Sequence, residues 1–168
     1  QFHKGNATLF EWANSPIVYK ITDEWKEIYN IGKKYFSKKS ALYHYYGTAN
    51  STYMQYLQND EVKYKKYVYA LRPLLACKYI EDNHSIPPVR FEELVKQNIP
   101  AELSEEIKRM LCIKAESNEK VMNPRLPVIQ RYIEDELVRY KQISKAMADD
   151  RTEEWEALNK VFLRLVGN

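Results

Sequence analysis

A stripe of cationic and phenolic side chains runs along one predicted helix, and these residues are the best suited to binding chemistry. Lys65, Tyr69, Arg72 and Tyr79 recur at helical spacing in KYKKYVYALRPLLACKYI, residues 63–80. At about 100° per residue they share one face. A guanidinium offers a planar fork to phosphate, an ammonium a point charge and a phenol a stacking surface. The stripe predicts a face that binds an anionic or planar group; the alternative is a solvated face of long side chains.

Pro73 directly follows Arg72 in this segment. Proline lacks the helical N–H and crowds the carbonyl four residues back, here that of Tyr69. We predict that Pro73 lies inside a bent helix, because helical patterning continues on both sides of it. The apolar stripe beside it, which includes Leu71 and Leu75, is predicted to be core. Two roles stay open for Arg72: it contacts a substrate, or it satisfies carbonyls freed by Pro73 or a buried acid.

The preceding helix carries a second group of candidates, His44 and Tyr45, in HYYGTANSTY. His44 is expected either to contact a ligand or to form a hydrogen bond between helices. Gly47 stands inside the same helix, where glycine costs about 1 kcal/mol relative to alanine. Close packing of another helix or close approach of a ligand would explain it.

Several kinds of active site have no support in the sequence. There is no glycine-rich phosphate loop, no Gly-x-Ser-x-Gly elbow and no histidine pair with metal-ligand spacing. Glu134, Asp135 and Glu136 are consecutive on a predicted helix, so they point in different directions and cannot converge on one ion. We therefore predict no catalytic residue and no metal ligand within this chain.

These groups must be positioned by helices. Glycine is rare, with four residues, and no hairpin signal occurs. We predict an all-α fold, an irregular bundle of six to eight helices, with one possible short strand near residues 16–20. Helices are predicted over residues 22–36, 41–57, 61–82, 104–112, 128–148 and 152–166, together with two short helices, one that begins with a Thr8–Glu11 capping box and one that begins at Phe91. Asn59-Asp60 is expected to cap helix 61–82 and Ser104 to begin helix 104–112. A loop is expected at 118–127.

Composition indicates an ordinary globular domain. The chain has 168 residues, 45% apolar and 29% charged, and a net charge of +3 that gives no strong basic field. One domain over residues 1–168 is expected. Cys77 and Cys112 are expected to be free, buried thiols, which favours a reducing compartment and hence the cytoplasm. No run is long enough for a membrane span and no signal peptide is visible, so no membrane partner is expected.

Three stretches together resemble one family. They are KGNATLFEWANSPIVY (residues 4–19), HYYGTANSTY (44–53) and KKYVYALRPLLACKYIEDNHSIPPVRFEELV (65–95). This pattern resembles the predicted nucleotidyltransferases of the polymerase-β superfamily, the group that includes RlaP and YcgL-type proteins. The similarity is specific over about the first 95 residues and only compatible beyond them. The sequence departs from the family pattern at Ala7, Trp12 and Tyr79.

The resemblance implies a function. Such enzymes use a Gly-Ser turn, an Asp-x-Asp pair and a third acid to hold two Mg²⁺ ions for nucleotidyl transfer from a nucleoside triphosphate (NTP). This chain has neither Asp-x-Asp nor Gly-Ser. We therefore expect it to be the C-terminal helical part of such an enzyme, with the catalytic palm domain upstream of residue 1, and to be inactive alone. The resemblance implies that Lys65, Tyr69 and Arg72 bind nucleotide or an acceptor that the sequence does not identify, RNA being possible. His44 and Tyr45 of the preceding helix are the other candidates for this binding.

Two other functions stay open at this point. The chain could be a helical protein-interaction module without a ligand, since an exposed apolar face would serve that role equally well. It could also be an RNA-binding helical domain, whose affinity would fall steeply with salt.

Overall fold

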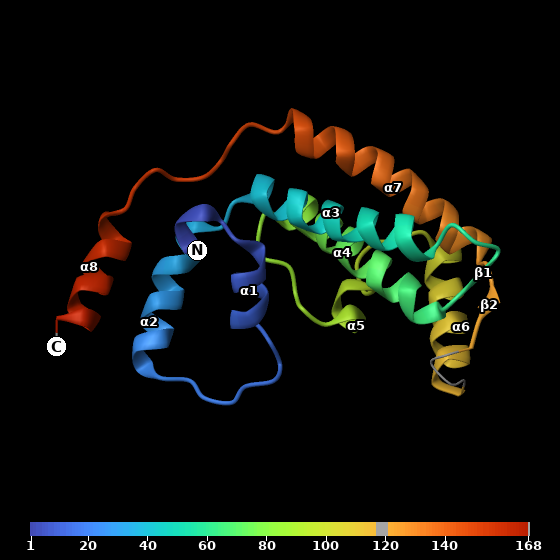
Figure 1. Ribbon diagram of the computed structural model, residues 1–168, viewed down its shortest axis with the longest axis horizontal. Coiled ribbons are helices and arrows are strands. Elements are labelled where there is room, and N and C mark those ends of the chain that lie inside the picture. Colours follow the sequence, from blue (N-terminus) through green and yellow to red (C-terminus); the bar gives the residue numbers. More distant parts are fainter. Residues whose placement is uncertain (117–120, 168) are drawn as a thin grey trace.

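The fold is all-α, as predicted. The computed structural model describes residues 1–116 and 121–167, and in that part it contains eight α-helices, two 3-10 turns and one pair of two-residue strands (Figure 1). The elements in chain order are η1 Phe2–Lys4, α1 Ala7–Ala13, α2 Asp23–Gly32, η2 Lys33–Tyr35, α3 Lys38–Tyr56, β1 Glu61–Val62, α4 Tyr64–Asn83, α5 Phe91–Leu94, α6 Ala101–Glu116, β2 Asn123–Pro124, α7 Pro127–Ala146 and α8 Glu156–Val166.

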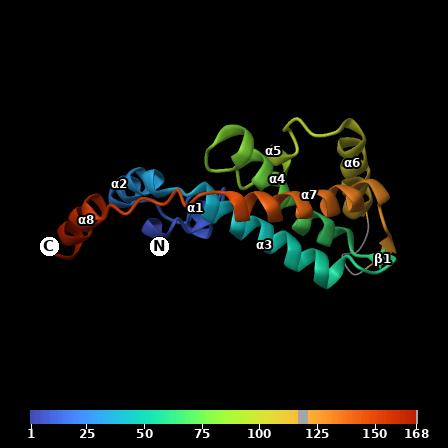
Figure 2. The ribbon, with the colours of Figure 1, turned by 90° about the horizontal axis from the view of Figure 1, so that it is seen from above.

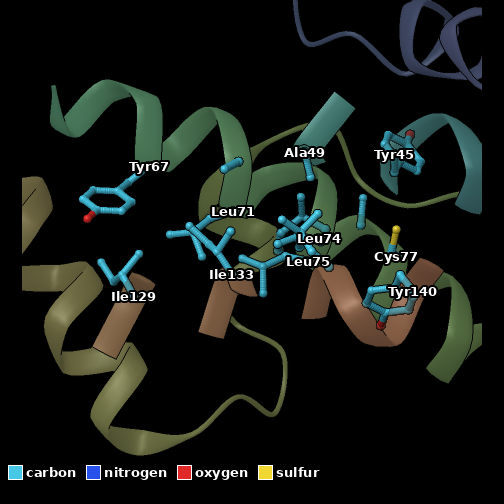
Figure 3. Packing of buried hydrophobic residues seen from close by; sticks show 14 of the residues in the cluster. Tyr45, Ala49, Tyr67, Leu71, Leu74, Leu75, Cys77, Ile129, Ile133 and Tyr140 are labelled. Carbon is cyan, nitrogen blue, oxygen red and sulfur yellow. The ribbon is translucent and has the colours of Figure 1, made fainter. Parts of the chain in front are cut away.

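The main core lies between the three longest helices, α3, α4 and α7 (Figure 1). Helix α6 packs at the end of the bundle where α4 and α7 begin. Tyr67, Leu71, Leu74 and Leu75 of α4 are fully buried and meet side chains of α3 and α7 (Figure 3). The predicted core stripe of α4 is therefore confirmed. Close packing of such side chains, rather than helix propensity, is what holds helices of this length in place.

Pro73 lies in the interior of α4, as predicted, and it is buried. The helix continues for ten residues beyond it, to Asn83. Burial on both sides of the proline, at Leu71 and Leu75, offsets the cost of the lost backbone hydrogen bond.

A second, smaller core lies at the opposite end of the molecule. Phe2 and Phe10 pack edge to face, with ring centroids 5.6 Å apart, and Tyr35 joins them. Figure 2 shows α1, α2 and α8 at this end, beyond the ends of α3 and α7. A long segment without regular structure links α7 to α8 (Figure 1), and the Asp150 carboxylate in it accepts the backbone N–H of Lys38 at 2.8 Å, at the start of α3.

Several local predictions are wrong. Residues 16–20 form no strand: Tyr19 is 98% exposed and has no neighbouring strand there, whereas the two short strands pair Glu61 with Pro124 and Val62 with Asn123. Because β1 occupies residues 61–62, α4 begins at Tyr64 and not at an Asn59-Asp60 cap.

Other helix ends also differ from the prediction. The residue that caps α1 is Asn6, whose side chain accepts the Thr8 N–H, so no Thr8–Glu11 capping box forms. Helix α6 begins at Ala101, directly after Pro100, and not at Ser104. Helix α8 begins at Glu156, four residues later than expected. Part of the predicted loop, residues 118–120, lies outside the described residues.

The two cysteines differ. Cys77 is a buried free thiol, as expected, and burial raises its pKa. Cys112 is free but exposed, so the expectation of burial is wrong there. None of the described helices is both long and apolar enough to cross a membrane.

Candidate functional site

Arg72 is the centre of a polar network that joins three elements. Its Nη2 donates to the Glu11 carboxylate of α1 at 2.7 Å, and its Nε donates to the Val89 carbonyl at 3.0 Å. Both side chains of the ion pair are largely shielded, with Arg72 30% and Glu11 19% exposed. Arg72 therefore fixes both α1 and the segment before α5 to the middle of α4.

Tyr45 of α3 lies behind this pair. Its side chain is buried, and burial, together with the nearby Glu11 carboxylate, raises the pKa of its hydroxyl. Figure 3 shows Tyr45 at the same end of the core as Cys77 and Tyr140. A buried, neutral phenol beside an ion pair supports the network and is shielded from a ligand in solution.

The other predicted site residues lie around this network without closing into one pocket. His44 is half-buried, and its ring meets that of Tyr45 edge to face at 5.2 Å. Tyr69 is 53% exposed, with Lys66 Nζ 5.5 Å from its ring. Lys65 is half-buried one helical turn before Tyr69. The structure thus brings Arg72, Tyr45 and His44 together, while Lys65 and Tyr69 extend along α4 toward its start.

A cavity of about 630 Å³ lies beside the Arg72 network, and none of the five predicted residues lines it. Its walls come from the residues that follow α1, from α2 and η2, from the last turns of α4, and from the segment that leads to α5 together with α5 itself. The lining residues are Asn14, Pro16, Tyr29, Lys33, Tyr79, Ser85, Ile86, Pro87, Pro88, Val89, Arg90 and Glu93. This volume is within the usual range for small-molecule sites.

The positions of these walls follow from the sequence. Arg72 holds the Val89 carbonyl, and Val89 is part of the cavity wall. Helix α4 ends at Asn83, and the next residue, His84, has a left-handed backbone with φ 52°, which turns the chain into the proline-rich segment that forms one side of the cavity. The sequence signals were Tyr79 at the end of the polar stripe and the rigid Pro87-Pro88 pair. Lys33 and Arg90 were missed because each lies outside the helix that carries that stripe.

The chemistry of the cavity suits an anion with a planar group. Lys33 Nζ lies 5.6 Å from the Tyr29 ring, and the Tyr29 hydroxyl accepts a hydrogen bond from Asn14 at 2.6 Å. Neither Lys33 nor Arg90 forms an ion pair with a carboxylate in the described part of the chain. Two cations that form no ion pair among the described residues, beside Tyr29 and Tyr79, can bind the phosphates of a ligand whose ring stacks on a tyrosine.

The described residues do not fit a pair of magnesium ions. They contain no group of three or more His, Cys, Asp or Glu side chains placed to hold a metal. The consecutive acids of α7 diverge: Glu134 accepts from Tyr53 at 2.7 Å, Glu136 pairs with Arg139 at 3.2 Å, and Asp135 is exposed. Burial raises the pKa of Glu136, which is unfavourable for holding a cation.

The chain is similar to known proteins over nearly its whole length. The model of the RNA repair pathway DNA polymerase beta family, RlaP, matches residues 2–164. An uncharacterized protein of Bacillus subtilis (strain 168), YcgL, is 34% identical over 167 residues, which is 98% of this chain and 64% of that protein. The chain thus spans slightly less than two thirds of this relative. No solved structure matches. On the match over residues 2–164, the chain belongs to the RNA repair pathway DNA polymerase beta family.

Proposed function

We propose that this chain is the helical substrate-binding domain of a polymerase-β-type nucleotidyltransferase and that its cavity holds a nucleoside triphosphate. Membership of the family implies a function related to nucleotidyl transfer. The observation that carries the finer proposal is the cavity of about 630 Å³ with two cations that have no counter-ion among the described residues, Lys33 and Arg90. In this proposal they contact the phosphates, and Tyr29 or Tyr79 stacks on the base.

The five residues singled out from the sequence take supporting parts in this proposal. Arg72 acts as a positioning residue, because it holds the Val89 carbonyl that forms part of the cavity wall. Tyr45 acts in the same way through its buried contact with the Arg72–Glu11 pair. His44 lies against Tyr45. Lys65 and Tyr69 lie nearer the start of α4. In this proposal they contact the acceptor, whose chemical class stays open and includes RNA.

The magnesium chemistry of nucleotidyl transfer needs carboxylates besides those described here. In the proposal they belong to a palm domain that works with this helical domain. No catalytic step is assigned to a residue of this chain.

Isothermal titration calorimetry with ATP, GTP, CTP and UTP tests the proposal. Replacing Lys33 with alanine removes one charge-assisted contact, worth about 1.5–3 kcal/mol, so affinity should fall by about ten- to a hundredfold. Lys34→Ala is the matched control, because Lys34 is an exposed neighbour that does not line the cavity. Equal affinity of the two variants, or no heat with any NTP, would contradict the proposal.

The same protein samples test the alternative that the chain is an RNA-binding domain. Titration with a single-stranded oligonucleotide at several salt concentrations should give weak binding. Tight binding with a steep salt slope, unaffected by Lys33→Ala, would favour RNA as the main ligand.

A further inference from the structure

A second groove lies between α3 and α7, and it shares no residue with the cavity proposed for nucleotide. Its volume is about 250 Å³. Tyr46 and Tyr53 of α3 and Leu137 and Val138 of α7 supply its apolar surface, with acidic and basic side chains at its edges. The proposed function uses none of these groups.

The apolar surface extends beyond the groove along α3. Met54 is 61% exposed and Tyr43 is also exposed, and they flank Gly47 on one helical face because the intervals are four and seven residues. Apart from the backbone of its own helical turns, a Cβ built on Gly47 would meet no atom of the described residues within 4 Å. The expectation that another helix of this chain packs closely on Gly47 is therefore wrong, and the absence of a side chain leaves room for an approaching surface.

The charges on α7 are arranged symmetrically about the apolar centre of the groove. Glu134 and Lys141 are seven residues apart, two helical turns, and line the groove on either side of Leu137 and Val138. A two-fold axis through the midpoint of Leu137 and Val138 would place Lys141 of a second copy opposite Glu134, and the reverse pair would form at the same time. Such self-complementarity is what an isologous interface requires.

Glu134 is already fixed in place for such a contact. Its carboxylate accepts hydrogen bonds from the Tyr53 hydroxyl at 2.7 Å and from Gln130 Nε2 at 2.8 Å. These two donors lower the pKa of Glu134, so the group is charged at neutral pH. A side chain that is held before binding loses less conformational freedom when a partner arrives.

From these observations we propose that the α3–α7 groove is the interface of a homodimer, in which two copies pack α7 against α7 in antiparallel fashion. The occupant is a second copy of this chain because the opposite charges at the two edges of the groove match one another under a two-fold rotation. Val138, 61% exposed in the single chain, becomes buried at the centre.

Analytical ultracentrifugation of three charge variants tests the proposal. Glu134→Lys places lysine against lysine in the dimer, and Lys141→Glu places glutamate against glutamate, so each variant alone should dimerise at least tenfold more weakly than the wild type. An equimolar mixture of the two should form a heterodimer, because one copy then presents two lysines and the other two glutamates. The double variant, with both charges reversed, should dimerise like the wild type.

Two further variants keep the test decisive. Val138→Arg changes an exposed side chain, so it should leave the far-UV circular dichroism unchanged and abolish dimerisation. Phe162→Glu alters an exposed apolar side chain on α8, at the other end of the molecule, and should leave the dimer intact. A monomeric wild type, a dimer that survives Val138→Arg, or a dimer lost only in Phe162→Glu would overturn the proposal. These outcomes do not depend on nucleotide binding.

Discussion

Replacing Arg72 with methionine should destabilise the fold through the loss of two hydrogen bonds. One runs to the Glu11 carboxylate at 2.7 Å and the other to the Val89 carbonyl at 3.0 Å. A hydrogen bond to a charged group is worth about 1.5–3 kcal/mol, but the pair is partly solvated, with Arg72 30% and Glu11 19% exposed. We expect a loss of about 2 kcal/mol, which corresponds to a fall of about 4–8 °C in melting temperature for a domain of this size.

A double-mutant cycle measures the pair itself. Thermal unfolding followed by circular dichroism would be recorded for Arg72→Met, Glu11→Gln and the combined variant. Because the two side chains are in contact, their coupling energy should exceed about 0.5 kcal/mol. Arg131→Met is the matched control: Arg131 is exposed on α7, so its loss should change stability by less than about 0.5 kcal/mol. If Arg72→Met resembled this control, or if the two single changes were additive, the network would not tie α1 to α4.

Three other changes test separate parts of the structure. Gly47→Ala should raise the free energy of unfolding by up to about 1 kcal/mol in a denaturant titration, because the added Cβ meets nothing; destabilisation would show that the site is crowded. Asp150→Ala removes the carboxylate that accepts the Lys38 N–H at the start of α3 and should cost about 1 kcal/mol; no change would show that the α7–α8 segment is not fixed there. Tyr53→Phe removes a hydrogen bond that lowers the pKa of Glu134, so an NMR titration should find that pKa closer to its ordinary value. The stability contributed by the ionised carboxylate would then be lost at a higher pH than in the wild type as acid is added. An unaltered pKa would show that Tyr53 does not cause the shift.

The helical fold was predictable because apolar periodicity and caps are local signals. Thr22, the first residue of the predicted helix 22–36, caps α2 through its side chain. Pro73 lies inside α4 because Leu71 and Leu75 are buried on both sides of it. The starts of α4 and α6 were misplaced because a strand pair at residues 61–62 and Pro100 set them. Strand pairing with residues 123–124 is a non-local contact that no local pattern reveals.

The candidate cavity was predictable only in part. Tyr79 belongs to the polar stripe predicted on α4, and Pro87 is followed by Pro88, a pair that makes the chain rigid there. Lys33 was unpredictable because it comes from η2, more than forty residues before Tyr79 in the chain. Arg72 was identified as special, but its partner Glu11 is 61 residues away, and such a pairing depends on how α1 packs on α4.

Photolabelling with 8-azido-ATP tests the central claim most directly, because it reports where a nucleotide sits. The claim predicts that mass spectrometry finds the label on peptides that contain Tyr29, Tyr79 or residues 85–90. Unlabelled ATP should compete with the labelling, and Lys33→Ala should reduce the labelling while Lys34→Ala should not. Competable label confined to other helices, or no label that ATP displaces, would contradict the claim that this cavity holds the nucleotide.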